Sequence, residues 1–205
     1  MRELRYLCED VLSEAVIRRI VSIHSTKLTA IPWISRGGKG NVRRKLTQAR
    51  EAAKNGVAVL VLIDLDTTPC ARAALTDWLG HPANMTCSNL IFRIAVREVE
   101  AWLLADCDGI SKRLGIAKSK VPRNVEAIES PKDALINLSR SSKLRPIRDG
   151  LVPSTKSGLS IGPEYNDILT DFVEGDWNFS SASLVSPSLQ RFLLRLQKFA
   201  SNNQT

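Results

Sequence analysis

The chain has 205 residues, a formal net charge of +8, and 43% hydrophobic and 24% charged residues, the composition of an ordinary globular protein. Its longest apolar run, Val57–Ile63, is too short to cross a membrane, and its first residues, MRELRYLCEDVLSE, contain no signal-peptide core, so we expect a cytoplasmic protein without a membrane segment. The four cysteines are widely spaced and have no histidine companions in a ligand pattern, which argues against zinc sites and disulfides.

The start of the chain predicts a strand, a helix and a second strand. Leu4–Cys8 is a short apolar run typical of a strand, and Val11–Ser22 has apolar residues at helical spacing. Leu28–Ile34 predicts the next strand, and Pro32 within it indicates an edge position or an irregularity, because proline cannot donate a ladder hydrogen bond. Ser35–Gly40 (SRGGKG) is predicted to be a loop, and it lacks the spacing of a nucleotide-hydrolysing phosphate loop.

The alternation continues as far as residue 105. A polar helix over Val42–Lys54 ends at Asn55-Gly56, a common helix stop. Val57–Ile63 (VAVLVLI) is short and continuously apolar, as in a strand buried on both faces of a parallel sheet. The next elements are a helix at Cys70–Leu79, a strand at Asn89–Val96 and a helix at Arg97–Ala105.

This order of elements predicts the fold class. Alternating strands and helices imply right-handed βαβ units, and hence an α/β fold with a Rossmann-like, open, mostly parallel sheet and helices on both faces. After it, Ser111–Leu138 and Pro187–Ala200 are predicted to be helical. We therefore expect an α/β core over residues 1–110 and a mainly helical, basic extension over residues 111–205 that packs on the core.

Three carboxylates directly follow predicted strands. Glu9 follows the first strand, and Asp64 and Asp66 follow the most apolar one, where an extended segment would place both aspartates on one side. The carboxyl ends of parallel strands meet at one edge, where carboxylates repel one another unless a cation neutralises them. Oxygen ligands without Cys or His favour Mg²⁺ or Mn²⁺. The alternative is that Glu9 and Asp10 cap the first helix and the two aspartates merely end a strand.

Two further carboxylates, Glu98 and Glu100, follow another strand of the same predicted sheet. On a helix they would diverge by about 200°, so that only one could face the site, whereas on extended backbone both could. We expect one of them to be the ligand of a second metal ion, with the other near a basic residue or solvent. Trp102 is expected to pack the following helix onto the sheet.

The positive charge is concentrated in the middle of the chain. Residues 112–156 carry 11 Lys/Arg and 4 Asp/Glu, a net +7, against +3 for residues 1–111 and −2 for residues 157–205. A local basic segment favours a polyanionic partner, although a solvated basic surface is the alternative. The segment has no interleaved aromatics, so it predicts phosphate contacts rather than base stacking. The expected nucleic-acid contacts, including two residues of the Val42–Lys54 helix, are Arg43, Arg44, Lys112, Lys118, Lys120, Lys132 and Arg145.

Two resemblances extend these expectations. A first strand ending in glutamate (LCEDVLSEAVIRRI) and a later strand ending in D-x-D (VLVLIDLD) resemble the Toprim domain of topoisomerases, primases and nucleases of the overcoming-lysogenization-defect type. The resemblance implies that Glu9, Asp64 and Asp66 are metal-binding and catalytic. Toprim proteins often have glycine after the glutamate, where this chain has Asp10.

The segments AVREVEAWLLAD, SPKDAL and SPSLQRFLLRL are similar to a Toprim-like family of unknown function (domain of unknown function 4276). Its members are often encoded beside an ATPase related to the structural-maintenance and ABC types. The resemblances together imply a metal-dependent nuclease acting on DNA or RNA as the effector of an anti-phage system with an ATPase partner. In that hypothesis Glu9, Asp64, Asp66 and Glu100 are catalytic, and Glu98 is a further metal ligand. The alternative hypothesis is a non-catalytic adaptor bound to the ATPase.

Overall fold

The computed structural model describes residues 1–34, 37–80, 87–155 and 158–202. Its four-stranded sheet is entirely parallel and has the strand order β2-β1-β3-β4. The strands are β1 (Arg2–Leu7), β2 (Leu28–Ile34), β3 (Ala58–Asp64) and β4 (Leu90–Ala95). The predicted open, parallel α/β fold is therefore confirmed.

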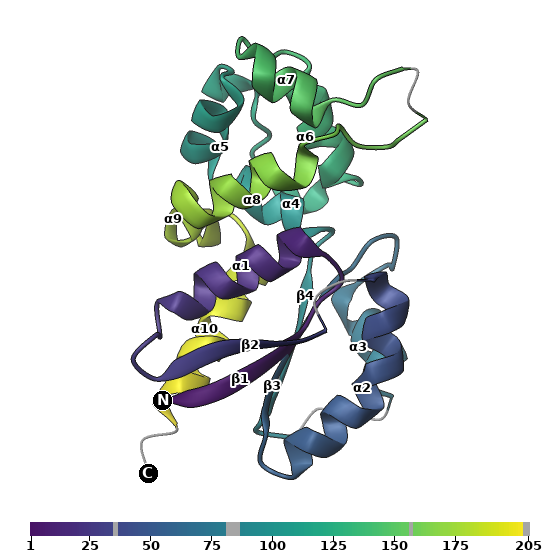
Figure 1. The fold of residues 1–205 in the computed structure, drawn as a ribbon, viewed down its shortest axis with the longest axis vertical. Helices are drawn as coiled ribbons and strands as arrows, with labels where there is room; N and C mark the ends of the chain where they lie inside the picture. The colour runs from purple at the N-terminus through teal and green to yellow at the C-terminus, as the bar shows by residue number, and fades with distance from the viewer. Residues whose placement is uncertain (35–36, 81–86, 156–157, 203–205) are drawn as a thin grey trace.

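Helices cover both faces of the sheet (Figure 1). One face carries α1 (Val11–Ser22) and α10 (Pro187–Ser201), and the other carries α2 (Gly38–Lys54) and α3 (Ala71–Leu79). Along β3, Leu60 and Leu62 face the first pair of helices, whereas Val59, Val61 and Ile63 face the second pair. Burial on both faces explains why this strand has no polar alternation.

β2 is an edge strand with an irregular register near its end. Tyr6 pairs with Pro32 and Leu7 pairs with Ile34, so Trp33 is passed over. The edge position and the irregularity expected from Pro32 are therefore both confirmed. An edge strand tolerates proline because the missing N–H is not needed by a neighbouring strand.

The helical half of the molecule lies beyond the carboxyl ends of the strands (Figure 1). Its helices are α4 (Val99–Ala105), α5 (Cys107–Leu114), α6 (Pro131–Ser139), α7 (Arg145–Leu151), α8 (Tyr165–Gly175) and α9 (Phe179–Ser183), with short 3-10 turns at Lys118–Lys120 and Val125–Ala127. The stretch Ser111–Leu138, expected to be helical, is interrupted. Gly115 ends α5 with a φ of +63°, and α6 begins only at Pro131, where the Ser130 side chain accepts from the Asp133 N–H.

A single hydrophobic cluster runs from the sheet into the helical half. At its centre Trp102 of α4 is fully buried, as expected, and its Nε1 donates to Ser188 Oγ on α10 at 2.7 Å. Trp177 in turn donates to the Trp102 carbonyl at 3.3 Å. Although α10 comes last in the chain, it returns to pack against β4, so the division at residue 110 stays a prediction.

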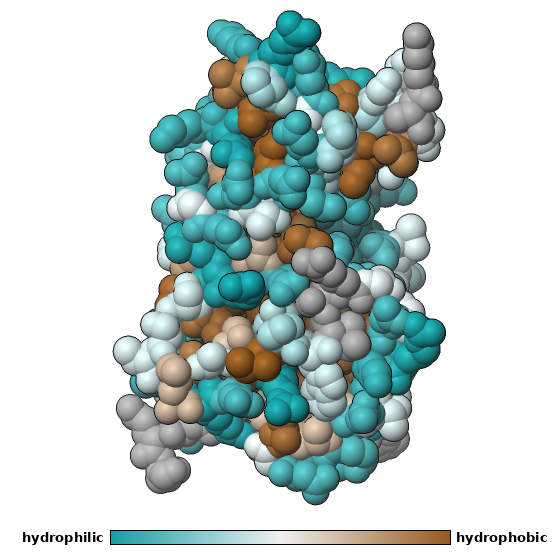
Figure 2. Space-filling view, in the orientation of Figure 1, coloured by the Kyte–Doolittle hydropathy of each residue, from teal (hydrophilic) through white to brown (hydrophobic). Residues whose placement is uncertain are grey.

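The face of the molecule seen in Figure 2 is mostly hydrophilic, and its hydrophobic residues lie in small separate groups. Among the helices of the described ranges, none combines the length and the apolar character needed to cross a membrane. All four cysteines are free thiols, of which only Cys8 is buried.

Candidate functional site

Asp64 is the centre of the candidate site, at the carboxyl end of β3. Its side chain is buried, and Oδ1 accepts a hydrogen bond from the Val99 N–H at the start of α4, at 3.0 Å. Burial raises the pKa of Asp64 well above the ordinary value, and the negative charges of Glu100, Asp10, Glu9 and Asp66 add to the effect. The strand thus delivers a carboxylate to a position where its charged form is poorly compensated.

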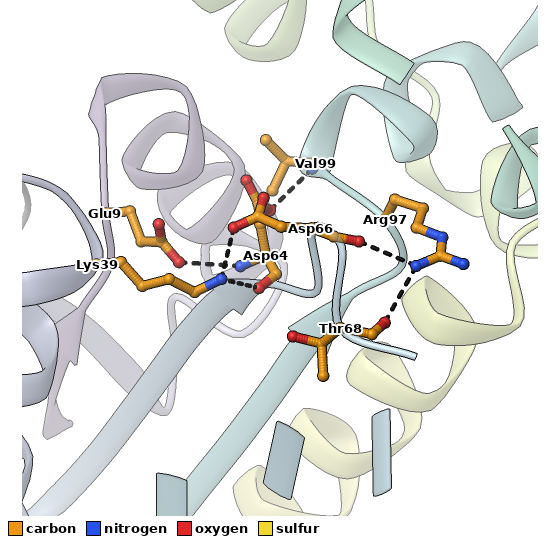
Figure 3. Close-up of polar contacts among 7 residues, drawn as sticks. All are labelled: Glu9, Lys39, Asp64, Asp66, Thr68, Arg97 and Val99. Atoms are coloured by element: carbon orange, nitrogen blue, oxygen red, sulfur yellow. Dashed lines mark hydrogen bonds and ion pairs between the residues drawn. The ribbon is translucent and has the colours of Figure 1, made fainter. Parts of the chain in front are cut away.

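Glu9 is joined to the same strand end. Its Oε1 accepts from the Asp64 N–H at 3.1 Å (Figure 3). Burial raises the pKa of Glu9, opposed by that hydrogen bond and by the charge of Lys39. Asp10, by contrast, caps α1 by accepting from the Ser13 N–H at 2.8 Å. The capping alternative therefore holds for Asp10, while Glu9 turns toward β3.

Asp66 is presented by a turn. Its φ is +50°, so the segment after Asp64 is not extended, and the expectation that one extended segment aligns the two aspartates is wrong. The turn is held by mutual contacts with Arg97, whose carbonyl accepts from the Asp66 N–H at 2.9 Å and whose Nη1 donates to the carbonyls of Asp66 and Thr68 (Figure 3). Aspartate tolerates this left-handed conformation better than most residues.

Lys39 neutralises part of this edge. Its Nζ lies 2.6 Å from Asp66 Oδ2 and 2.8 Å from the Asp64 carbonyl (Figure 3). Lys39 belongs to the segment expected to be a loop, but α2 already begins at Gly38, and this start directs the lysine to the sheet edge. Of that expected loop, residues 35 and 36 lie outside the described residues.

Glu98 and Glu100 converge on Lys132. Glu98 precedes α4 with extended backbone, and its Oε2 accepts from the Lys132 backbone N–H at 2.8 Å. Glu100 lies in the first turn of α4, only 2% exposed, and its Oε1 accepts from the Tyr165 hydroxyl at 2.8 Å and lies 3.7 Å from Lys132 Nζ. The switch from extended to helical backbone between them allows both to face one partner, which a helix alone would prevent.

The electrostatics of this pair link it to Asp64. Burial raises the pKa of Glu100 to about 7, against the opposing charge of Lys132. Burial favours neutral Lys132, but the carboxylates of Glu100, Glu98 and Asp64 outweigh it and raise the pKa of the lysine. Since Glu100 also raises the pKa of Asp64, the two groups of carboxylates form one acidic edge.

The chemistry of this edge suits a hard cation, but the side chains are not assembled around one. Carboxylate oxygens are the ligands that Mg²⁺ and Mn²⁺ prefer, and the buried Glu100 Oε2 has no partner in the described part of the chain. Within the described ranges, no three Asp, Glu, His or Cys side chains are grouped so that they could hold a metal. Binding would require the carboxylates to turn inward and Lys39 to release Asp66.

The residues expected to contact nucleic acid do not share one surface. Arg43 pairs with Asp77 at 2.7 Å and stacks over Trp78, and Arg44 bonds to Asn41, all at the sheet end of the molecule. In the helical half Lys118 pairs with Asp108, Arg145 pairs with Asp149, Lys112 lines a cavity of about 600 Å³, and Lys120 is exposed. Of these predicted contacts, Lys132 is the one that the structure brings to the acidic edge.

Two members of the site, Lys39 and Tyr165, were not predicted from the sequence. Lys39 belongs to the glycine-rich segment Ser35–Gly40, which the sequence predicts to be a loop, and Tyr165 contacts Glu100 from 65 positions along the chain. Contacts of that range depend on the packing of α8 against α1 and α7, which no local pattern indicates.

No curated protein and no solved structure matches the chain. A match to a known family covers residues 2–159, which include all four strands and the six carboxylates Glu9, Asp10, Asp64, Asp66, Glu98 and Glu100. The matched region ends before α8, so Tyr165 and α10 lie outside it. Because the match extends over well more than half of the chain, the protein belongs to the family described as "Domain of unknown function (DUF4276)".

Proposed function

We propose that this protein is a metal-dependent phosphodiesterase that cleaves DNA or RNA. The observation that carries the proposal is the pair of buried, weakly compensated carboxylates, Asp64 and Glu100, at the carboxyl edge of a parallel sheet. A fold gains nothing in stability by burying like charges together, so such a pair points to a ligand that neutralises them. The position of Glu9 after β1 and of Asp64 and Asp66 around the end of β3 supports a relation to the Toprim nucleases.

In this mechanism Glu9, Asp64, Asp66 and Glu100 would hold the cation, with Glu98 beside them, once their side chains had turned toward it. Bound Mg²⁺ or Mn²⁺ would supply an activated water and would stabilise the charge on the phosphate. Tyr165 fixes the orientation of Glu100 through its hydroxyl. Lys132, partly exposed next to Glu100, can place its ammonium on a phosphate oxygen, and Lys39 can do so after leaving Asp66.

The cellular setting of the proposal comes from the resemblance alone. We infer a cytoplasmic effector of anti-phage defence that works with an ATPase of the structural-maintenance or ABC type. Adaptor function is the second candidate. It is favoured by the ion pair of Lys39 with Asp66, because an ammonium in that place neutralises the edge without a metal.

A nuclease assay separates the two candidates. Purified wild type, Asp64→Asn and the control Asp77→Asn are incubated with plasmid, single-stranded DNA and tRNA, with Mg²⁺, with Mn²⁺ and with EDTA. Asparagine keeps an acceptor for the Val99 N–H but removes the charge, so we expect cleavage to fall by about 100-fold or more while folding is retained. Asp77, on the surface of α3, is expected to be dispensable. Cleavage that is equal in wild type and Asp64→Asn, or that is absent even when the proposed ATPase partner is added, would favour the adaptor function.

A further inference from the structure

Three arginines meet at the outer side of β4, apart from the acidic edge. Arg93 lies on β4 between Phe92 and Ile94, which face α3, and therefore it points to the opposite side, toward α10. Arg191 and Arg195 lie one turn apart on α10 and act electrostatically on Arg93. We call Arg93, Arg191 and Arg195 the arginine cluster.

Among the described residues, the arginine cluster has no acidic partner. Arg93 Nη1 donates to the Phe92 carbonyl at 3.0 Å, and Arg195 Nη2 donates to the Ser88 carbonyl at 3.2 Å. Within the described ranges no carboxylate pairs with any of the three arginines, and the buried Arg93 Nε has no hydrogen-bond partner. The residues outside those ranges include no Asp or Glu, so they add no acidic side chain.

Such an arrangement is unfavourable for the free protein. Like charges four residues apart on a helix repel each other, and a partly buried guanidinium without a counter-charge is poorly solvated. Burial, together with Arg195 and Arg191, lowers the pKa of Arg93 to about 10. An anion bound between the three side chains would relieve all of these effects at once.

A small cavity beside β4 has the size of a phosphate group. It measures about 130 Å³ and is lined on its polar side by Arg93, Arg191 and Ser188, while Arg195 lies one turn further along α10 and does not line it. The apolar wall of the cavity is formed by Ala71, Leu75, Phe92, Ile94 and Val96. At about 30 Å³ per water molecule, it holds on the order of four waters. That volume accommodates one tetrahedral oxyanion, and it excludes a whole nucleotide.

The arginine cluster also lies close to the acidic edge. Arg93 is paired with Leu62 of β3, and Asp64 comes two residues later, which is about 7 Å along the strand. Arg97, four residues after Arg93, contacts the carbonyl of Asp66. Repeating anions spaced along one chain could therefore reach the arginine cluster and a cation at the acidic edge together, which favours a nucleic-acid backbone over an acidic protein surface.

We propose that the arginine cluster binds one backbone phosphate of the nucleic-acid substrate and holds the strand alongside β4, so that a neighbouring phosphate would lie at the cation that Asp64 would help to hold. The inference rests on the proposed function, since it states where that substrate lies. It places the main phosphate contact on α10 and β4, away from the basic segment of residues 112–156.

Binding without cleavage tests this inference separately from catalysis. The affinity of the full chain for a fluorescent single-stranded oligonucleotide is measured by anisotropy, in EDTA, over a series of salt concentrations. The variant Arg191→Gln/Arg195→Gln is compared with wild type and with Arg18→Gln/Lys27→Gln, which removes the same charge from exposed positions on α1 and before β2. A parallel titration uses polyglutamate in place of the oligonucleotide.

We expect the cluster variant to bind the oligonucleotide about tenfold more weakly than wild type. The slope of the logarithm of the binding constant against the logarithm of the salt concentration should also become less steep, by about 0.7 for each phosphate that is no longer neutralised. The control should change neither, and the melting temperature of the cluster variant should be equal to or higher than that of wild type. Equal affinity of the two double variants for the oligonucleotide would overturn the inference. It would also be overturned if the cluster variant lost affinity for polyglutamate but not for the oligonucleotide, because the arginine cluster would then bind an acidic protein. If the binding results are as expected but Asp64→Asn does not reduce cleavage, the proposed reaction is wrong and the phosphate site remains supported.

Discussion

At the scale of single residues, the candidate site is defined by where its charges are poorly compensated. Glu100 is the extreme case. It is almost fully buried, its Oε2 has no hydrogen-bond partner among the described residues, and Lys132 Nζ lies 3.7 Å from its Oε1. Its pKa of about 7 lies near the pH at which the protein is expected to work. Protonation of Glu100 therefore couples stability and cation binding in that range.

The pH dependence of stability follows from this shift. The folded pKa of about 7 lies above the ordinary 4.5, so the folded state retains a proton that the unfolded state releases between these values. Stability must then fall as pH rises from about 4.5 to 7. We expect Glu100→Gln to be more stable than wild type at pH 8, by on the order of 2–3 kcal/mol, and nearly equal to it at pH 4.5.

Urea unfolding at pH 4.5, 6 and 8 without divalent metal measures this effect. Glu51→Gln, on the surface of α2, serves as the control, because its carboxylate is exposed and pairs with Lys54 of the same helix. The pKa of Asp64 is also raised by burial, so part of the pH dependence of stability should remain in the Glu100→Gln variant. A wild-type stability that rises over this pH range would contradict the assignment of Glu100 as the buried acid.

At the scale of elements, the strands and the first helix could be predicted well because their hydrophobic patterns are local. Val11–Ser22 and Leu28–Ile34 coincide with the expected boundaries. The early start of α2 at Gly38 was not predictable, since consecutive glycines disfavour helix. The breaks between α5 and α6 depend on Gly115 and on packing, and the contacts of Lys39 and Tyr165 depend on elements remote in sequence.

The junction of β1 and α1 shows why this chain needs no glycine at position 10, where the Toprim proteins that it resembles often have one. Asp10 has a φ of −148°, an extended conformation that needs no glycine, and its side chain caps the helix. We expect Asp10→Ala to destabilise the protein by about 1 kcal/mol, whereas Asp10→Asn should keep the cap and Asp10→Gly should cost only a few tenths. Thermal unfolding of the three variants tests this order. An alanine variant as stable as wild type would show that the cap contributes nothing.

At the scale of the whole molecule, the helical half and the sheet share one core. Trp102 lies at their junction, and Ser188 on α10 accepts its Nε1–H. Glu126 in turn accepts from both the Ser188 N–H and the Ser188 hydroxyl, at 2.8 and 2.7 Å. The helical half and the sheet therefore stabilise each other, and the acidic edge lies where they meet.

This shared core predicts a single cooperative unfolding transition. Ser188→Ala would leave the buried Trp102 Nε1 without an acceptor, at a cost of about 1–3 kcal/mol, and should shift the whole transition to lower temperature. For each protein taken separately, thermal unfolding followed by far-UV and by near-UV circular dichroism should give the same midpoint. The exposed Ser141→Ala provides the comparison. Two separated transitions would mean that residues 111–205 fold as an independent domain.

Pro32 and the bulge beside it also decide how the sheet can meet other molecules. An exposed edge strand ordinarily offers a row of backbone donors and acceptors to which a foreign strand can add. On β2 that row lacks the N–H of Pro32 and changes register at Trp33, while on the other side α10 packs along β4. Strand addition at the β2 edge, a common first step in aggregation, is therefore disfavoured, and partners are expected to recognise that edge through its side chains.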